Sequence, residues 1–123
     1  MHPESFFPSR ENPIEDLWLN NNFIEHSATL RALLETLPKL RLLDMSNNLL
    51  EEIGYGTVSN HMHLEMLILE NNRIQRIGRE SFTNLPSLRE LKLGNNSINY
   101  HIGTPYWNLP ALKVMYVVCF NLM

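Results

Sequence analysis

The sequence contains a single cysteine, Cys119, among 123 residues. One thiol cannot form a disulfide within the chain, so we expect either a reducing compartment or a piece of a longer secreted protein. The sequence also lacks a large excess of charge of either sign, because the net charge is only -3. This excludes the strongly basic character of a nucleic-acid-binding domain.

Long apolar runs are also absent. The most apolar stretch, residues 107–123, is interrupted by polar residues and Pro110, so we predict no membrane span in it. The first residues, MHPESFFPSREN, lack the basic start and continuous apolar core of a signal peptide. Residues 1–13 are polar and proline-rich, and we expect them to form a loose N-terminal segment.

What the sequence does have is one apolar frame that returns five times. The frame reads apolar, two variable, apolar, one variable, apolar, and it starts at Ile14, Leu40, Leu64, Leu88 and Leu112. The resulting units are residues 14–39, 40–63, 64–87, 88–111 and an incomplete 112–123. A fixed period of about 24 residues is the mark of a repeat architecture. We therefore expect one repeat domain over residues 14–123.

Each unit contains a short segment in which apolar and variable residues alternate, such as Leu67-Ile68-Leu69. Alternation places every second side chain on one face of a strand, so the framework leucines would point inward. One such strand is not stable alone. Stacked in parallel with its neighbours, it would bury a continuous aliphatic column.

An asparagine follows the strand in each of the first four units. These asparagines are Asn22, Asn48, Asn72 and Asn96. The chain must turn there, which leaves backbone N–H and C=O groups away from water, and such groups need partners. A carboxamide offers both a donor and an acceptor. We therefore predict a ladder of asparagines that bonds to successive turns.

The segments that connect one strand to the next differ between units. Residues 28–35 are good helix formers after Ser27, which predicts a helix with Ser27 as its N-cap. In the third unit, the spacing of Phe82 and Leu85 predicts one face of a helical turn. The second unit, which contains Gly54, Gly56 and His61, is expected to be irregular.

The frame resembles the leucine-rich repeat family, in particular its typical 24-residue subclass. Residues 88–96, LRELKLGNN, are similar to the equivalent stretch of small leucine-rich proteoglycans and receptor ectodomains. Residues 17–22, LWLNNN, followed by a helical unit, resemble intracellular phosphatase-regulating repeat proteins. The resemblance implies an α/β fold: a right-handed solenoid with a parallel sheet on its concave side, and a helix and irregular turns on its convex side.

The sequence departs from the family in two ways. The resemblance to extracellular members implies cysteine-rich caps, and none is present. In the fifth unit, Phe120 stands where the asparagine belongs. A last repeat without a polar cap would expose its apolar edge. We expect the chain to be a fragment, and the alternative is that a partner or a second copy covers this edge.

Family members commonly bind proteins through the outward residues of the concave strands, and grouped exposed apolar residues mark such sites. The predicted partner-binding residues are Trp18, Asp44, Ile68, Glu70, Lys92, Tyr116, Asp16, Leu42, Met66 and Glu90. The alternative is that neighbours cover Leu42 and Met66, since strands favour such residues in any case.

Other motifs predict less. His61 and His63 suggest a metal pair, but without a third ligand a solvated loop is the better interpretation, so we predict no metal site. Arg73, Arg76 and Arg79 would meet an anion or, as we prefer, form a solvated charged segment. No catalytic set or cofactor motif is present, so we predict a protein that is not an enzyme and needs no cofactor.

Asn95-Asn96-Ser97 is the one glycosylation sequon, and Asn95 is expected to point away from the core. Together these features predict a protein–protein interaction module that binds a matrix component, receptor or ligand on its concave face. We expect it to belong to an extracellular matrix or receptor-type protein. The alternative is a cytoplasmic regulatory scaffold that docks on an enzyme such as a phosphatase. Nucleic acid is not an expected partner, and the oligomeric state stays open.

Overall fold

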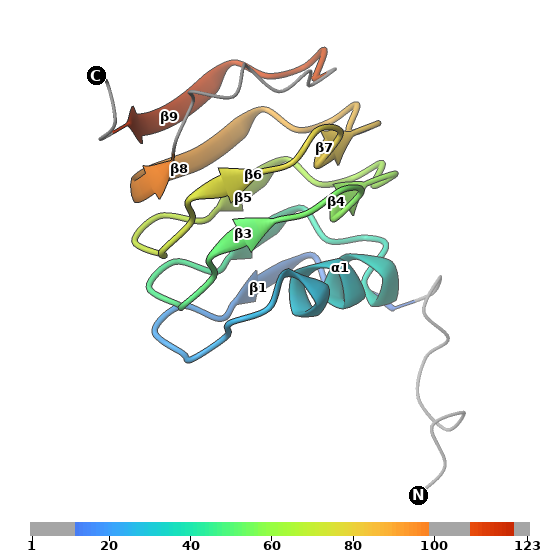
Figure 1. The fold of residues 1–123 in the computed structure, drawn as a ribbon. Coiled ribbons are helices and arrows are strands. Elements are labelled where there is room, and N and C mark those ends of the chain that lie inside the picture. The colour runs from blue at the N-terminus through green and yellow to red at the C-terminus, as the bar shows by residue number, and fades with distance from the viewer. Residues whose placement is uncertain (1–11, 99–108, 120–123) are drawn as a thin grey trace, which may run out of the picture.

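The computed structural model describes residues 12–98 and 109–119, the last six of them as backbone only. Within these residues the chain forms nine strands and one helix (Figure 1). The elements are β1 (Asp16–Trp18), α1 (Ser27–Thr36), β2 (Leu42–Asp44), β3 (Glu52–Ile53), β4 (Val58–Ser59), β5 (Met66–Ile68), β6 (Arg76–Ile77), β7 (Phe82–Thr83), β8 (Glu90–Ile98) and β9 (Val114–Cys119).

The strands lie in three parallel sheets. The largest has five strands in the order β1-β2-β5-β8-β9, one from each unit (Figure 1). Its register pairs residues at the same position of the frame, so one row across the sheet reads Trp18, Asp44, Ile68, Lys92 and Tyr116. The predicted parallel pairing of the strands is therefore confirmed. Two smaller sheets, β3-β6 and β4-β7, join the connecting segments of the second and third units.

The core is a stack of the framework residues. Leu43, Leu67 and Leu91, which are paired in register across β2, β5 and β8, are fully buried. At the β1 end of the stack the burial is less complete: Leu17 and Leu19 are only half-buried, because no described repeat lies beyond β1. The apolar frame thus buries itself through contact between neighbouring units.

Helix α1 is the one helical connection among the described residues, and its start corrects the sequence prediction. Ser27 lies inside the helix, and the N-cap residue is His26, which makes no side-chain capping bond. The backbone supplies the first bond instead, since Thr29 N donates to His26 O. The helix packs through Leu30 and Leu34, which are buried one turn apart.

The connections of the second and third units contradict two predictions. The second unit is not irregular, because Glu52–Ile53 and Val58–Ser59 pair in register with the third unit. The helical turn predicted for Phe82 and Leu85 is wrong, because Phe82–Thr83 is an extended strand, although both side chains are buried. Glu80 and Asn84, on either side of it, have positive φ angles of 55° and 53°. Such angles do not occur within a right-handed helix.

The asparagines after the strands form a continuous set of hydrogen bonds. Asn72 Nδ2 donates to the carbonyls of Met45 (3.1 Å), Leu69 (3.1 Å) and Glu70 (3.2 Å), and its Oδ1 accepts from Leu50 N (3.1 Å). Each asparagine thus joins the turn of its own unit to the turn of the unit before.

The same pattern holds at the two neighbouring buried positions, Asn48 and Asn96. Asn22 differs, because it is exposed and its Nδ2 donates only to carbonyls of its own unit, Leu19 and Asn20.

A second set of asparagines directly precedes the first, one residue earlier in each unit. These residues, at the turn itself, have positive φ angles of 60°, 56°, 55° and 57°: Asn21, Asn47, Asn71 and Asn95. Asparagine tolerates this left-handed conformation better than most residues. Each Asn-Asn pair therefore divides two tasks: the first residue turns the backbone and the second bonds to it.

Candidate partner-binding face

The outward side chains of the five-stranded sheet form the candidate site, which we call the sheet face. Its described members are the outward residues of four strands and one residue that follows β5: Asp16, Trp18, Leu42, Asp44, Met66, Ile68, Glu70, Glu90 and Lys92. The parallel register brings nine of the ten predicted binding residues together as side chains on one surface. For the tenth, Tyr116, the described backbone pairs with Lys92, and its side chain lies outside the described set.

The apolar part of the sheet face is graded in exposure. Trp18 is 60% exposed, whereas Leu42, Met66 and Ile68 are half-buried between their neighbours. Leu42 and Met66 are directly paired across β2 and β5. Neighbouring strands therefore cover part of each of these side chains and leave the rest at the surface.

The carboxylates of the sheet face differ in how many contacts they make with neighbouring residues. Asp44 Oδ1 accepts hydrogen bonds from Ser46 N (2.9 Å) and Ser46 Oγ (2.6 Å), which fix its direction. Asp16 Oδ1 lies 3.9 Å from the guanidinium of Arg41. Glu70 and Glu90 make no ion pair with a described residue.

A charged row, which the sequence prediction missed, lines one edge of the sheet face. Glu15 lies 3.1 Å from Arg41, Arg41 lies 3.9 Å from Glu65, and Glu65 lies 3.0 Å from Arg89. All four residues directly follow the first apolar residue of their units, so alternating charge at one frame position was the signal available. These pairs are half-exposed, and each contributes little to stability.

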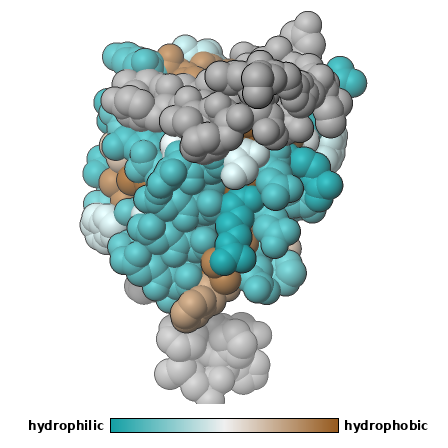
Figure 2. Space-filling model, turned by 60° about the vertical axis from the view of Figure 1, so that its left-hand side comes forward, coloured by the Kyte–Doolittle hydropathy of each residue, from teal (hydrophilic) through white to brown (hydrophobic). Residues whose placement is uncertain are grey.

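The turn edge of the sheet, where the exposed asparagines lie, differs from the sheet face. Figure 2 brings this edge forward and shows a largely hydrophilic surface. Asn95 is exposed there and its Nδ2 donates to Asn71 Oδ1, while Asn96 is buried beside it. Asn95 thus points away from the core.

The two histidines do not form a pair. His63 is exposed, but His61 is buried, with Nε2 2.9 Å from Leu37 O and Nδ1 accepting from Leu64 N at 3.1 Å. The interpretation as a solvated loop is therefore wrong for His61, because this side chain joins the residue after α1 to the start of the third unit. Burial lowers the pKa of His61; the bond to Leu37 opposes this, and the nearby His63 adds to the lowering.

Stability is expected to fall as the pH drops below about 6.5, the ordinary pKa of histidine. The lowered pKa keeps folded His61 neutral where the unfolded chain already takes up a proton, so acid favours unfolding. This site contributes a slope of at most about 1.4 kcal/mol per pH unit. Urea unfolding across this range would measure it. His61→Gln should remove this contribution and His63→Gln should keep it; equal slopes for wild type and His61→Gln would contradict the assignment.

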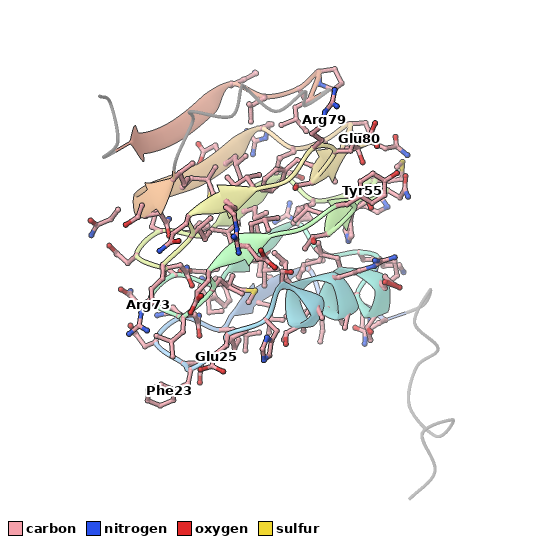
Figure 3. The ribbon with its side chains drawn as sticks, viewed as in Figure 1. Phe23, Glu25, Tyr55, Arg73, Arg79 and Glu80 are labelled. Carbon is pink, nitrogen blue, oxygen red and sulfur yellow. The ribbon has the colours of Figure 1, made fainter. Side chains whose placement is uncertain are left out.

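The three arginines after β5 do not meet at one anion site. Arg76 pairs with Glu52 at 3.0 Å, whereas Arg73 and Arg79 make no ion pair with a described residue. Figure 3 shows Arg73 and Arg79 at opposite sides of the molecule, with Glu80 beside Arg79. All three are exposed, as in a solvated charged segment.

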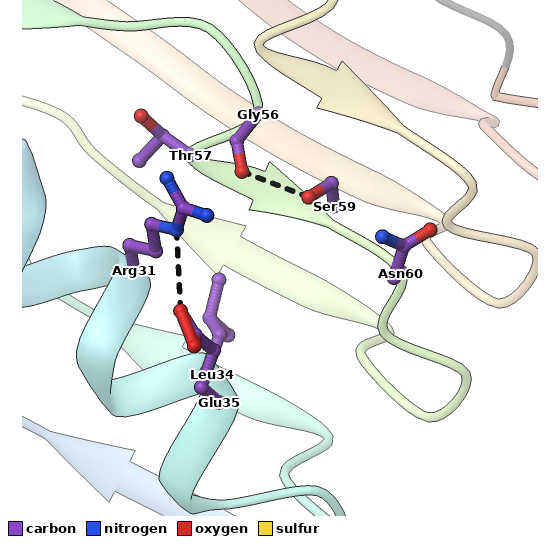
Figure 4. A pocket seen from close by; sticks show the side chains of 7 residues that line it. All are labelled: Arg31, Leu34, Glu35, Gly56, Thr57, Ser59 and Asn60. Atoms are coloured by element: carbon purple, nitrogen blue, oxygen red, sulfur yellow. Dashed lines mark hydrogen bonds and ion pairs between the residues drawn. The ribbon is translucent and has the colours of Figure 1, made fainter.

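An open hollow of about 260 Å³ lies between α1 and the loop around β4 (Figure 4). It is polar: Arg31 Nε donates to Glu35 Oε1 at 3.2 Å beside Ser59 and Asn60. Among the described residues, no three His, Cys, Asp or Glu side chains gather as metal ligands. No helix in this part of the chain is long and apolar enough to cross a membrane.

Three sets of predictions lie outside the described residues. They concern residues 1–11 of the N-terminal segment (1–13) that was expected to be loose, the Cys119 thiol and the uncapped end at Phe120.

Comparison with known families identifies the class. Residues 62–119 match the family model described as leucine rich repeat. Residues 62–119 therefore belong to the leucine-rich repeat family, and the units before residue 62 carry the same frame in the same sheet. Leucine-rich repeats generally mediate protein–protein interaction and are typically not enzymes. No solved structure matches the chain.

Proposed function

We propose that this protein is an interaction module that binds a protein partner on the sheet face. One observation carries the proposal: the in-register sheet holds Trp18, 60% exposed, beside Leu42, Met66 and Ile68 on one surface. Tryptophan is a favoured residue of binding hot spots, and grouped apolar residues at a surface mark interaction sites. As part of this proposal, the stacked repeats form a right-handed curved solenoid whose concave side is the sheet face.

Replacing Trp18 and Ile68 together by alanine is expected to weaken partner binding by tenfold or more, about 1.4 kcal/mol. The double variant should stay folded, because Trp18 is exposed and Ile68 only half-buried. Quantitative mass spectrometry of proteins co-purified with the full chain would measure the loss for each interaction. Tyr55→Ala is the control, since Tyr55 is 73% exposed in the turn after β3. If the folded double variant keeps every interaction unchanged, the proposal of binding on the sheet face is overturned, and a purely structural role for the protein is favoured.

We further propose that the protein belongs to an extracellular matrix or receptor-type protein. The exposed sequon residue Asn95 supports this. The endogenous protein should then lose mass on enzymatic deglycosylation, and Asn95→Gln should abolish that loss, as intact-mass measurement would show.

The second candidate is a cytoplasmic scaffold docking on an enzyme such as a phosphatase. The ten-residue helix α1 in the first unit supports it, through the resemblance of that unit to phosphatase-regulating repeats. Unmodified Asn95 together with a reduced Cys119 thiol in endogenous protein would favour this candidate.

A further inference from the structure

The sheet face is unbalanced in charge. Its described members carry four carboxylates, on Asp16, Asp44, Glu70 and Glu90, against the single ammonium of Lys92. The flanking row of Glu15, Arg41, Glu65 and Arg89 is neutral overall and does not offset this excess. A partner that buries this face must therefore bring positive charge with it, because like or unpaired charges at an interface cost affinity.

Two of these carboxylates are placed around one position. Asp44 is held by Ser46, and it lies directly opposite Ile68, two residues before Glu70 in the next strand segment. With strands about 4.8 Å apart and about 3.3 Å per residue, the backbones of Asp44 and Glu70 lie about 8 Å apart. Carboxylates on backbones this close can both accept charge-assisted hydrogen bonds from one lysine or arginine head group.

Gly94, which has no side chain, leaves room for the carboxylate of Glu70. A Cβ atom at Gly94 would lie 3.3 Å from Glu70 Oε2, so the carboxylate of Glu70 rests over the bare backbone of the next unit. Glu70 itself makes no ion pair with a described residue. Its charge is positioned but not neutralised, which is the state expected of a group that meets a ligand.

An apolar surface lies at a fixed separation from this acidic position. Leu42 and Met66 are half-buried neighbours on β2 and β5, and Met66 precedes Glu70 by four residues. In extended chain this spacing is about 13 Å. A partner segment in extended conformation would span it with about four residues.

We infer that the sheet face binds an extended protein segment that is both basic and apolar. Its lysine or arginine lies between Asp44 and Glu70, and an apolar side chain about four residues away packs on Leu42 and Met66. Gly94 acts as a positioning residue through Glu70. The inference rests on the proposed function and adds to it the chemistry of the partner.

Selection from a library of displayed random peptides on the immobilised full chain would test it. Selected peptides should combine a basic residue with an apolar residue about four positions away. For a selected peptide made by synthesis, Glu70→Gln should raise Kd about tenfold. A new selection on the charge-reversed variant Glu70→Lys should yield acidic peptides instead. Gly94→Ala should raise Kd severalfold with an unchanged melting temperature, because Gly94 has no positive φ and only the end of Glu70 must move.

Glu51→Gln is the matched control, since Glu51 is exposed, lies just before β3 and loses the same charge. It should leave Kd unchanged. The two proposals fail in distinguishable ways. If Trp18→Ala with Ile68→Ala weakens the peptide but Glu70→Gln does not, the binding face stands and the basic partner is overturned. If neither change alters Kd for any selected peptide, both are overturned.

Discussion

Replacement of Asn72 by leucine is expected to lower the free energy of unfolding by about 3–5 kcal/mol, since each buried polar group left without a partner costs about 1–3 kcal/mol. Asn72 is buried and makes four hydrogen bonds to the backbone, joining two successive turns. Leucine can neither donate to the carbonyls of Met45 and Leu69 nor accept from Leu50 N. Against a total stability of about 5–15 kcal/mol, this loss is large enough to be seen directly in chemical denaturation.

Asn22→Leu is the matched control because it makes the same change at the same frame position. Asn22 is exposed, and its Nδ2 donates only to carbonyls of its own unit. Water can replace those bonds, so the cost should stay below about 1 kcal/mol. Equal losses for Asn22→Leu and Asn72→Leu would show that the bonds between units contribute nothing, and would contradict this account of the ladder.

Phe82→Ala is expected to cost about 3–5 kcal/mol, the range for removal of a buried aromatic side chain. Phe82 is fully buried, and its strand pairs with Val58–Ser59 of the preceding unit. Loss of the ring would leave a cavity in the core, and the surrounding side chains relax only partly into such a space. The unfolding midpoint in urea measures the loss.

Phe23 offers the comparison for the same substitution. It is 86% exposed, so Phe23→Ala removes little buried area and should change stability by no more than about 0.5 kcal/mol. Comparable destabilisation by the two substitutions would mean that Phe82 is not part of the packed core.

Much of the sheet could be predicted because its signal is local and repeated. The register follows from the frame itself: residues at equal positions, such as Trp18, Asp44 and Ile68, lie side by side. Inward and outward directions follow from the two-residue period of a strand. The residues that make up the sheet face could therefore be predicted from the sequence. That this face binds a partner stays a prediction.

The connecting segments could not be predicted in the same way. Phe82–Thr83 extends as a strand between positive φ angles at Glu80 and Asn84, and Glu80 has no intrinsic preference for such an angle. His61 has no apolar period around it, and its burial is set by two backbone groups, at Leu37 and Leu64, that come from different elements. Pairing between units overrides local propensity at both places.

The alternating row of Glu15, Arg41, Glu65 and Arg89 bears on how such a chain can lose or gain units by recombination. Excision of residues 40–63 would bring Glu15 beside Glu65, two carboxylates in place of an ion pair. Excision of residues 40–87 would bring Glu15 beside Arg89 and restore the attraction. Loss or gain of two units at a time would thus keep the charge alternation without any compensating change, whereas loss of one unit would not.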